Sequence, residues 1–171
     1  RYNATTVGAN MNATINVISN DSNEATYNFN IRGTTLNPEI DVEGNSTSIT
    51  NNDTTPTTID WTDFGDTDIE SGTVSRVFTI RNNGTTPLTI TNPTISGTHA
   101  GDFTVTVNPT STTINAGNNR TFTVVFNPSA IGVRNATITI TNNDADENPY
   151  VFNISGNGTS AEINVRGNSN D

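Results

Sequence analysis

Residues 135–156 read NATITITNNDADENPYVFNISG, which is two segments of alternating apolar residues joined by an acidic turn. Ile138 and Ile140 alternate with threonines before the turn, and the alternation resumes at Tyr150. A period of two residues is typical of β-strands that bury one face. The stretch therefore predicts a β-hairpin whose two strands share one apolar face.

A similar hairpin sequence occurs a second time near the start of the chain. Residues 12–33 read NATINVISNDSNEATYNFNIRG and align with residues 135–156 without a gap, at an offset of 123 residues. At the same offset, EIDVEGNS (39–46) matches EINVRGNS (162–169). A fixed offset of this kind indicates a tandemly repeated unit.

The repeat divides the chain into three parts. We expect residues 1–36 to be the C-terminal part of a preceding repeat, residues 37–159 to be one complete repeat, and residues 160–171 to be the first strand of a following repeat. The chain is then either a window onto a longer array or a subunit whose end strands complete its neighbours by strand addition.

Composition narrows the classes of protein to consider. The chain has 171 residues, is 30% hydrophobic and carries a net charge of −10. That acidity argues against binding nucleic acid, and no apolar run is long enough for direct membrane insertion. Cysteine is absent, which removes disulfides, thiolate metal sites and cysteine nucleophiles. The 28 isoleucines and valines, against two leucines, favour β-strands.

Alternation continues through the complete repeat. The predicted strands are EIDVE (39–43), TVSRVFTIR (73–81), PLTIT (87–91), DFTVTV (102–107), RTFTVVF (120–126), NATITIT (135–141) and YVFNIS (150–155). Asn83-Gly84 predicts a turn with positive φ. About seven short strands at these spacings predict an all-β fold, an immunoglobulin-like antiparallel β-sandwich, with a jelly roll as the alternative.

One face of each predicted strand is expected to point into the core. The inward residues are Val74, Phe78, Ile80, Leu88, Ile90, Phe103, Val105, Val107, Phe122, Val124, Phe126, Ala136, Ile138, Ile140, Tyr150, Phe152 and Ile154.

Several stretches of the chain resemble the repeats of choice-of-anchor D proteins. They are PEIDVEGNS (38–46), TDFG (62–65), SGTVSRVFTIRNNGTTPLTI (71–90), AGDFTV (100–105), FTVVFNPS (122–129) and ATITITNNDADENPYVFNISGNG (136–158). Those are large bacterial surface and secreted proteins, and their sandwich repeats are similar to Hydin-type immunoglobulin-like domains. The resemblance implies export, tandem arrays and a scaffolding or adhesive role, and it supplies no catalytic motif.

The acidic turn is a candidate calcium site. Asp144, Asp146 and Glu147 place three carboxylates close together, and hard cations such as Ca²⁺ prefer oxygen ligands. The stretch from Asp60 to Glu70 is similarly acidic. The earlier copy carries Asn23 in place of Asp146, which a solvated turn tolerates better than a strict metal site. An acidic turn that discourages edge pairing is therefore the alternative.

Glycosylation is the second kind of candidate site, because Asn-X-Ser/Thr is the acceptor motif for N-glycans in secreted proteins. The motif occurs at Asn3, Asn12, Asn20, Asn45, Asn52, Asn83, Asn119, Asn135, Asn153 and Asn157. With so many asparagines and threonines in the chain, most of these motifs are also expected by chance.

The sequence does not predict an enzyme, and no cofactor is expected apart from calcium. His99 is the lone histidine and lies in a loop, GTHAGDF, without an associated nucleophile. Each acidic cluster is local to one turn, whereas glycoside hydrolysis needs two opposed carboxylates. Trp61 is either a sugar-stacking platform or a plug at the end of the sandwich.

These observations favour a structural extracellular protein. The expected role is a cell-surface stalk or filament of tandem sandwiches, whose partners are neighbouring copies of the same repeat, joined covalently or by strand complementation. The alternative is an adhesin, a carbohydrate- or protein-binding module stabilised by calcium.

Overall fold

The computed structural model describes residues 10–34 and 36–162. Within these ranges the chain forms strands and a single short 3₁₀ turn, η1 (Ala100–Asp102). The strands are β1 (Asn10–Ile18), β2 (Thr26–Thr34), β3 (Ile40–Gly44), β4 (Thr47–Ile49), β5 (Asp63–Asp68), β6 (Val74–Asn82), β7 (Leu88–Thr89), β8 (Thr94–Ser96), β9 (Phe103–Val107), β10 (Thr113–Ile114), β11 (Asn119–Phe126), β12 (Gly132–Ile140) and β13 (Tyr150–Thr159). None of the described segments is a helix long and apolar enough to cross a membrane.

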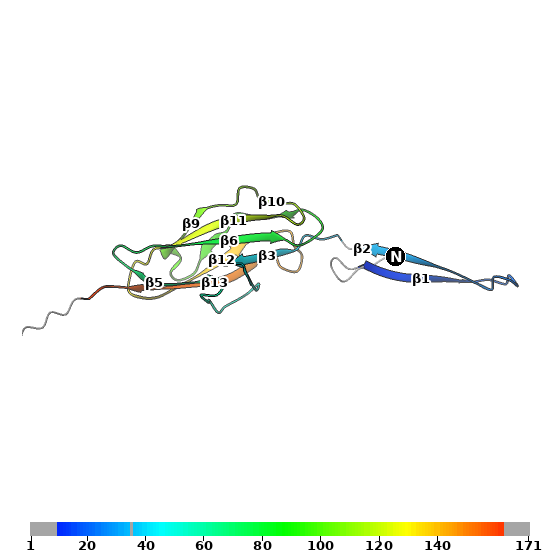
Figure 1. The fold of residues 1–171 in the computed structure, drawn as a ribbon, viewed down its shortest axis with the longest axis horizontal. Coiled ribbons are helices and arrows are strands. Elements are labelled where there is room, and N and C mark those ends of the chain that lie inside the picture. Colours follow the sequence, from blue (N-terminus) through cyan, green and yellow to red (C-terminus); the bar gives the residue numbers. More distant parts are fainter. Residues whose placement is uncertain (1–9, 35, 163–171) are drawn as a thin grey trace, which may run out of the picture.

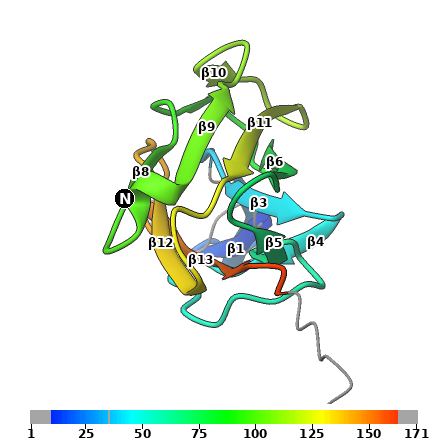
Figure 2. The same cartoon turned by 90° about the vertical axis from the view of Figure 1, so that its left-hand side faces the viewer.

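Two sheets form a sandwich between β3 and β13 (Figures 1 and 2). One has the strand order β4-β3-β6-β11-β9, the other has the order β5-β13-β12-β8, and β7 pairs with β10 in a short ribbon. The two-layer all-β architecture expected from the sequence is confirmed. The sheets are not wholly antiparallel, because β5 runs parallel to β13.

The hairpin quoted first in the sequence lies at the centre of the second sheet. β12 and β13 pair in an unbroken antiparallel register from Gly132↔Gly158 to Ile140↔Tyr150. β13 continues past its predicted end at residue 155, because small residues take over its buried face. A Cβ on Gly156 would lie 2.4 Å from the Phe126 ring, so only glycine fits opposite that ring.

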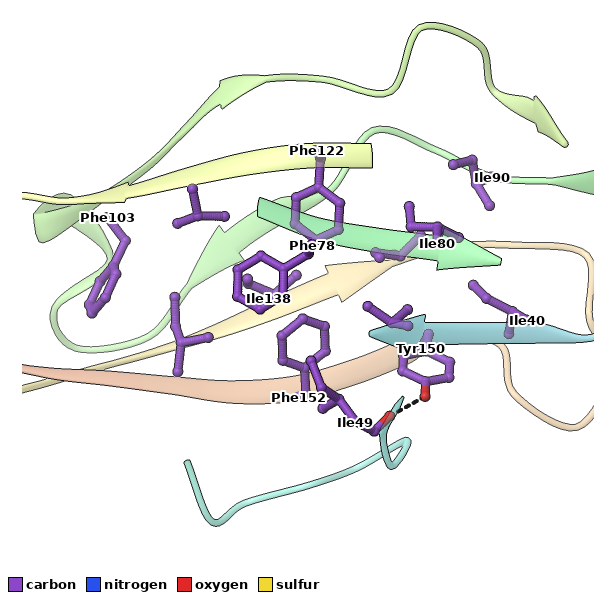
Figure 3. Packing of buried hydrophobic residues seen from close by; sticks show 14 of the residues in the cluster. Ile40, Ile49, Phe78, Ile80, Ile90, Phe103, Phe122, Ile138, Tyr150 and Phe152 are labelled. Atoms are coloured by element: carbon purple, nitrogen blue, oxygen red, sulfur yellow. Dashed lines mark hydrogen bonds between the residues drawn. The ribbon is translucent and has the colours of Figure 1, made fainter. Parts of the chain in front are cut away.

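The core between the two sheets is built around phenylalanine (Figure 3). Phe78 of β6 stacks on Phe122 of β11, with ring centroids 5.3 Å apart, and also contacts Phe152 of the opposite sheet at 5.8 Å. Phe64 of β5 contacts Phe126 at 6.0 Å and so makes a second link between the sheets. Aromatic pairs at these separations contribute beyond the area that they bury.

Nearly all of the predicted inward residues are buried, and Val107 is the exception. Its side chain is 53% exposed. The pairing of β9 with β11 shifts register between Thr123 and Val124, so that Val105 opposes Val124 and Val107 opposes Thr123. Such a bulge breaks the alternation that the prediction assumed. Val74 and Val105 are partly buried and pack against the core.

The prediction that the Asn83-Gly84 turn has a positive φ is wrong for Gly84. Its φ is not positive, since the positive-φ glycines of the described chain are residues 65, 97, 117 and 132. Gly84 is instead required by close approach, because a Cβ there would lie 2.3 Å from the carbonyl oxygen of Asn37 and 2.6 Å from the amide nitrogen of Glu39.

β1 and β2 form a separate hairpin that pairs with neither sheet of the sandwich. Figure 1 shows it beyond the end of the sandwich at which β3 begins. Ile15, Val17, Tyr27, Phe29 and Ile31 are all exposed large apolar residues of this hairpin. The hairpin therefore has an apolar face that the sandwich does not cover.

Equivalent substitutions in the two hairpins should have very different effects. Phe152→Ala opens a cavity in the core and should lower the free energy of unfolding of the sandwich by about 3–5 kcal/mol. Phe29→Ala should leave that free energy unchanged. Urea unfolding followed by the fluorescence of Trp61, the single tryptophan of the chain, reports on the sandwich alone. An equal shift for both variants would mean that the β1–β2 hairpin packs against this sandwich.

Candidate functional site

A buried asparagine shapes the acidic turn between β12 and β13. The side-chain amide of Asn142 donates to the carbonyl oxygens of Ile140 at 3.3 Å and Glu147 at 2.9 Å. Its Oδ1 accepts a hydrogen bond from the backbone N–H of Asp144 at 2.8 Å. These bonds close the turn upon itself and direct Asp144 inward, where its side chain is only 1% exposed.

Three carboxylates meet beside this turn. One oxygen from each of Glu39, Asp144 and Glu147 lies within 4.8 Å of the others, and the described residues contain no second such group of three. The structure thus brings together two of the three predicted calcium ligands, Asp144 and Glu147. Asp146 is exposed and stays outside the group. Glu39, which precedes β3, completes the cluster, although the sequence did not predict it as a ligand.

The cluster contains oxygen atoms without hydrogen-bond donors. Asp144 Oδ2 accepts from the backbone N–H of Ile40 at 2.9 Å, but its Oδ1 is buried and has no partner. Oε2 of Glu147 is likewise buried and without a partner. The arginines of the sandwich that form ion pairs do so elsewhere, Arg81 with Glu43 and Arg134 with Asp102.

The crowding of negative charge changes the acidity of the cluster. Burial raises the pKa of Glu147 from 4.5 to about 7, and the rise is increased by the charges of Glu39, Asp144, Asp146 and Asp41. Burial also raises the pKa of Glu39 and that of Asp144. All three carboxyl groups therefore resist ionisation in the folded protein.

In the other acidic stretch, Asp60 to Glu70, aspartates form hydrogen bonds within turns, and the carboxylates do not form a cluster of three. Asp60 Oδ1 accepts from the hydroxyls of Thr57 and Thr62, at 2.9 and 2.6 Å. Asp68 Oδ1 accepts from the backbone N–H of Glu70 and that of Ser71. These are the local bonds by which aspartates stabilise turns.

The predicted glycosylation sites differ in accessibility. Asn3 lies outside the described residues. Seven of the motif asparagines are exposed: Asn12, Asn20, Asn45, Asn52, Asn83, Asn119 and Asn135. Asn153 and Asn157 are half-buried in β13, and the side-chain amide of Asn157 donates to Asp66 Oδ1 at 2.8 Å. An amide nitrogen held in this way is a poorer acceptor for a glycan.

His99 and Trp61 have structural partners. His99 Nδ1 accepts a hydrogen bond from the backbone N–H of Asn135 at 3.0 Å, which ties the η1 loop to β12. The half-buried Trp61 lies under the guanidinium of Arg76, which is 5.2 Å from the ring centroid. Both contacts suit a role in holding loops against the sandwich.

Stability should fall as the pH rises through the pKa of Glu147. Between pH 4.5 and about 7 the folded protein keeps a proton on Glu147 that the unfolded chain has lost, so raising the pH favours unfolding. In EDTA, the melting temperature should fall by a few degrees between pH 5 and pH 8. Glu147→Gln should flatten this dependence, whereas Glu70→Gln, in the other acidic stretch, should not. Parallel profiles for all three proteins would contradict the assignment.

Comparison with known proteins gives a family match for the sandwich and several proteins of similar structure. A family model described as "Protein of unknown function (DUF1573)" matches residues 57–158, and no curated protein matches the chain. A protein of unknown function from Porphyromonas gingivalis W83 is similar in structure, with a TM-score of 0.51 and 14% identity, over 91% of this chain and 68% of that one.

Two further solved structures are similar at lower scores. The ASH/PapD-like domain 7 of human CEP192 gives a TM-score of 0.49 at 15% identity, over 76% of this chain and 92% of that one. The CARDB domain of PF1109 from Pyrococcus furiosus gives 0.43 at 14% identity, over 72% and 97%. At these identities the likeness concerns the fold alone. With more than half of its residues matched by the family model, the chain belongs to the DUF1573 family.

Proposed function

We propose that this protein is a structural extracellular module, in which successive immunoglobulin-like sandwiches form a cell-surface stalk or filament. In this proposal residues 37–159 are one sandwich, and the β1–β2 hairpin is the closing hairpin of the sandwich before it. The observation that carries the proposal is the strand register of that hairpin.

The two hairpins pair residue for residue in the same way. In β1–β2, Ala13 opposes Ile31, Ile15 opposes Phe29 and Val17 opposes Tyr27. In β12–β13, Ala136 opposes Ile154, Ile138 opposes Phe152 and Ile140 opposes Tyr150. Each residue of the first hairpin is thus 123 positions before its counterpart in the second. A one-residue slip would have moved every apolar side chain to the other face.

The surroundings of the two hairpins differ sharply. Phe29 is 43% exposed and Tyr27 57% exposed, whereas Phe152 and Tyr150 are 0% and 2% exposed. An isolated two-stranded hairpin is marginally stable in water, and contiguous exposed apolar patches mark interaction sites. The occupant that best fits this face is a sheet equivalent to β4-β3-β6-β11-β9, because that sheet covers the identical face of β12–β13.

The connection between hairpin and sandwich is short and anchored. The fully buried side chain of Asn82 accepts from the backbone N–H of Glu39 at 3.3 Å. The Asn37 carbonyl oxygen accepts from Thr85 N–H at 2.9 Å, and the Glu39 carbonyl oxygen accepts from Asn83 N–H at 2.8 Å. Only residues 35 and 36 separate the end of β2 from this anchored segment. Successive units would therefore be held in a restricted orientation, as an extended array requires.

The extracellular setting rests on different support. The chain resembles choice-of-anchor D repeats, and seven of its Asn-X-Ser/Thr motifs are exposed. An adhesive role remains the alternative, in which the loops of each unit bind a carbohydrate or protein ligand.

The anchored segment should depend on Gly84. Gly84→Ala forces a Cβ against the backbone of Asn37 and Glu39, so it should destabilise the sandwich by about 1–3 kcal/mol and speed proteolytic cleavage between residues 34 and 39. Gly101→Ala is the matched control, because no atom lies within 4 Å of its Cβ position and its φ is not positive. Cleavage at equal rates in both variants would show that the segment is not held.

Imaging tests the array itself. Electron microscopy of the protein as its source organism produces it should show stiff rods with evenly spaced sandwiches, one for each repeat of the sequence. Compact particles, or single sandwiches joined by flexible tethers, would contradict the stalk. If a bound ligand is seen only at the tips of such rods, the sandwiches are structural units and a separate adhesin lies at the tip.

A further inference from the structure

We propose that Glu39, Asp144 and Glu147 bind one calcium ion, at the end of the sandwich where β3 begins. This inference does not depend on the tandem array, because all three residues belong to the one complete sandwich and ion binding can be measured on the chain 1–171.

The geometry of the cluster suits a single hard cation. Ca²⁺ binds oxygen ligands at about 2.3–2.6 Å, so two ligands on opposite sides of the ion are separated by up to about 5 Å. The three carboxylates each offer an oxygen within 4.8 Å of the others. Together they supply three to six oxygens of the six to eight that Ca²⁺ takes, and water can supply the rest. Mg²⁺ demands a tighter octahedron and should bind more weakly.

A second observation distinguishes this cluster from an ordinary acidic surface. The side chain of Asp144 is 1% exposed, yet its Oδ1 has no hydrogen-bond partner, and the same holds for the buried Oε2 of Glu147. A buried carboxylate oxygen without a partner is costly unless a cation or a donor compensates it. The turn around Asn142 nevertheless holds Asp144 in this position with three hydrogen bonds.

Wherever another copy of the repeat includes one of the three ligand positions, the residue there is unchanged, whereas the position of Asp146 is changed. Asp144 and Glu147 correspond to Asp21 and Glu24 in the earlier copy, and Glu39 corresponds to Glu162 in the later one. Asp146, which lies outside the cluster, is the position that changes to asparagine, at Asn23. The substitution that argued against a metal site in the sequence therefore falls on a residue that supplies none of the three clustered oxygens.

Binding at this site would act on the anchored segment. Glu39 lies immediately after Asn37 and Pro38, where the chain enters the sandwich from the β1–β2 hairpin. Asp144 and Glu147 lie in the closing turn, about a hundred residues later. An ion shared by these residues would fasten the entry of the chain to the closing hairpin. In the proposed array, the same ion would stiffen the junction between units.

Calorimetric titration of the EDTA-treated chain at pH 7.5 tests the proposal with Ca²⁺ itself. We expect one ion per chain, with a Kd of about 10⁻⁴–10⁻³ M, the range of extracellular calcium modules. Ten millimolar CaCl₂ should raise the melting temperature by more than NaCl of equal ionic strength does, because a ligand that binds only the folded state stabilises it. No binding heat, or equal shifts with the two salts, would overturn the proposal.

Three variants test the assignment of ligands. Glu39→Gln and Glu147→Gln should each weaken Ca²⁺ binding about ten-fold or more. Glu70→Gln, in the other acidic stretch, should change it by less than about three-fold, and the melting temperatures in EDTA show whether each protein is folded. Because Glu39 and Glu147 are only half-buried, their variants should fold even if one at Asp144 does not. Equal weakening by all three variants would mean diffuse charge attraction instead of a site.

Discussion

A β-hairpin with one apolar face is stable in water only when a second layer covers that face. In this chain β12 and β13 satisfy the constraint, because the β4-β3-β6-β11-β9 sheet covers Ile138 and Phe152 completely. The contacts from Phe152 to Phe78 and from Phe64 to Phe126 are where the two layers meet. The β1–β2 hairpin has the same register and the same apolar face, yet it lies outside the sandwich. We propose the array because the apolar face of the β1–β2 hairpin, like that of β12–β13, needs a second layer to cover it.

The acidic cluster depends on the same hairpin. The register of β12–β13 fixes Ile140 opposite Tyr150, and the intervening turn is closed by Asn142. The hydroxyl of Tyr150 donates to the carbonyl oxygen of Ile49 (Figure 3), which ties this end of β13 to the strand that pairs with β3. The turn is thereby held beside the start of β3, where Asp144 reaches the backbone of Ile40 and the carboxylate of Glu39. The closed end of the sandwich and the candidate ion site therefore both depend on the register of the β12–β13 hairpin.

Alternating sequence predicted the long strands and most of the core, because a period of two directly reflects one buried face. It did not predict that Ile49, Phe64 and Ile114 are buried. Each of these residues lies in a short strand, in which little alternation can be seen. The alternation wrongly predicts Val107 in the core, because a bulge cannot be seen in a pattern of residues. Glu39 was missed for a different reason: its partners are a hundred residues away, and only the folded register brings them together. The retention of Glu162 at the equivalent position was the one available signal.

The central claim is that the apolar face of the β1–β2 hairpin is covered in the native protein. Hydroxyl-radical footprinting with mass spectrometry measures this directly, by comparing oxidation of the peptide containing Tyr27 and Phe29 with that of the peptide containing Tyr150 and Phe152. In the chain 1–171 the first peptide should be oxidised strongly and the second weakly. In the protein as its source organism makes it, the account predicts that both peptides are protected equally. Oxidation of Phe29 that stays as high as in the chain 1–171 would contradict it.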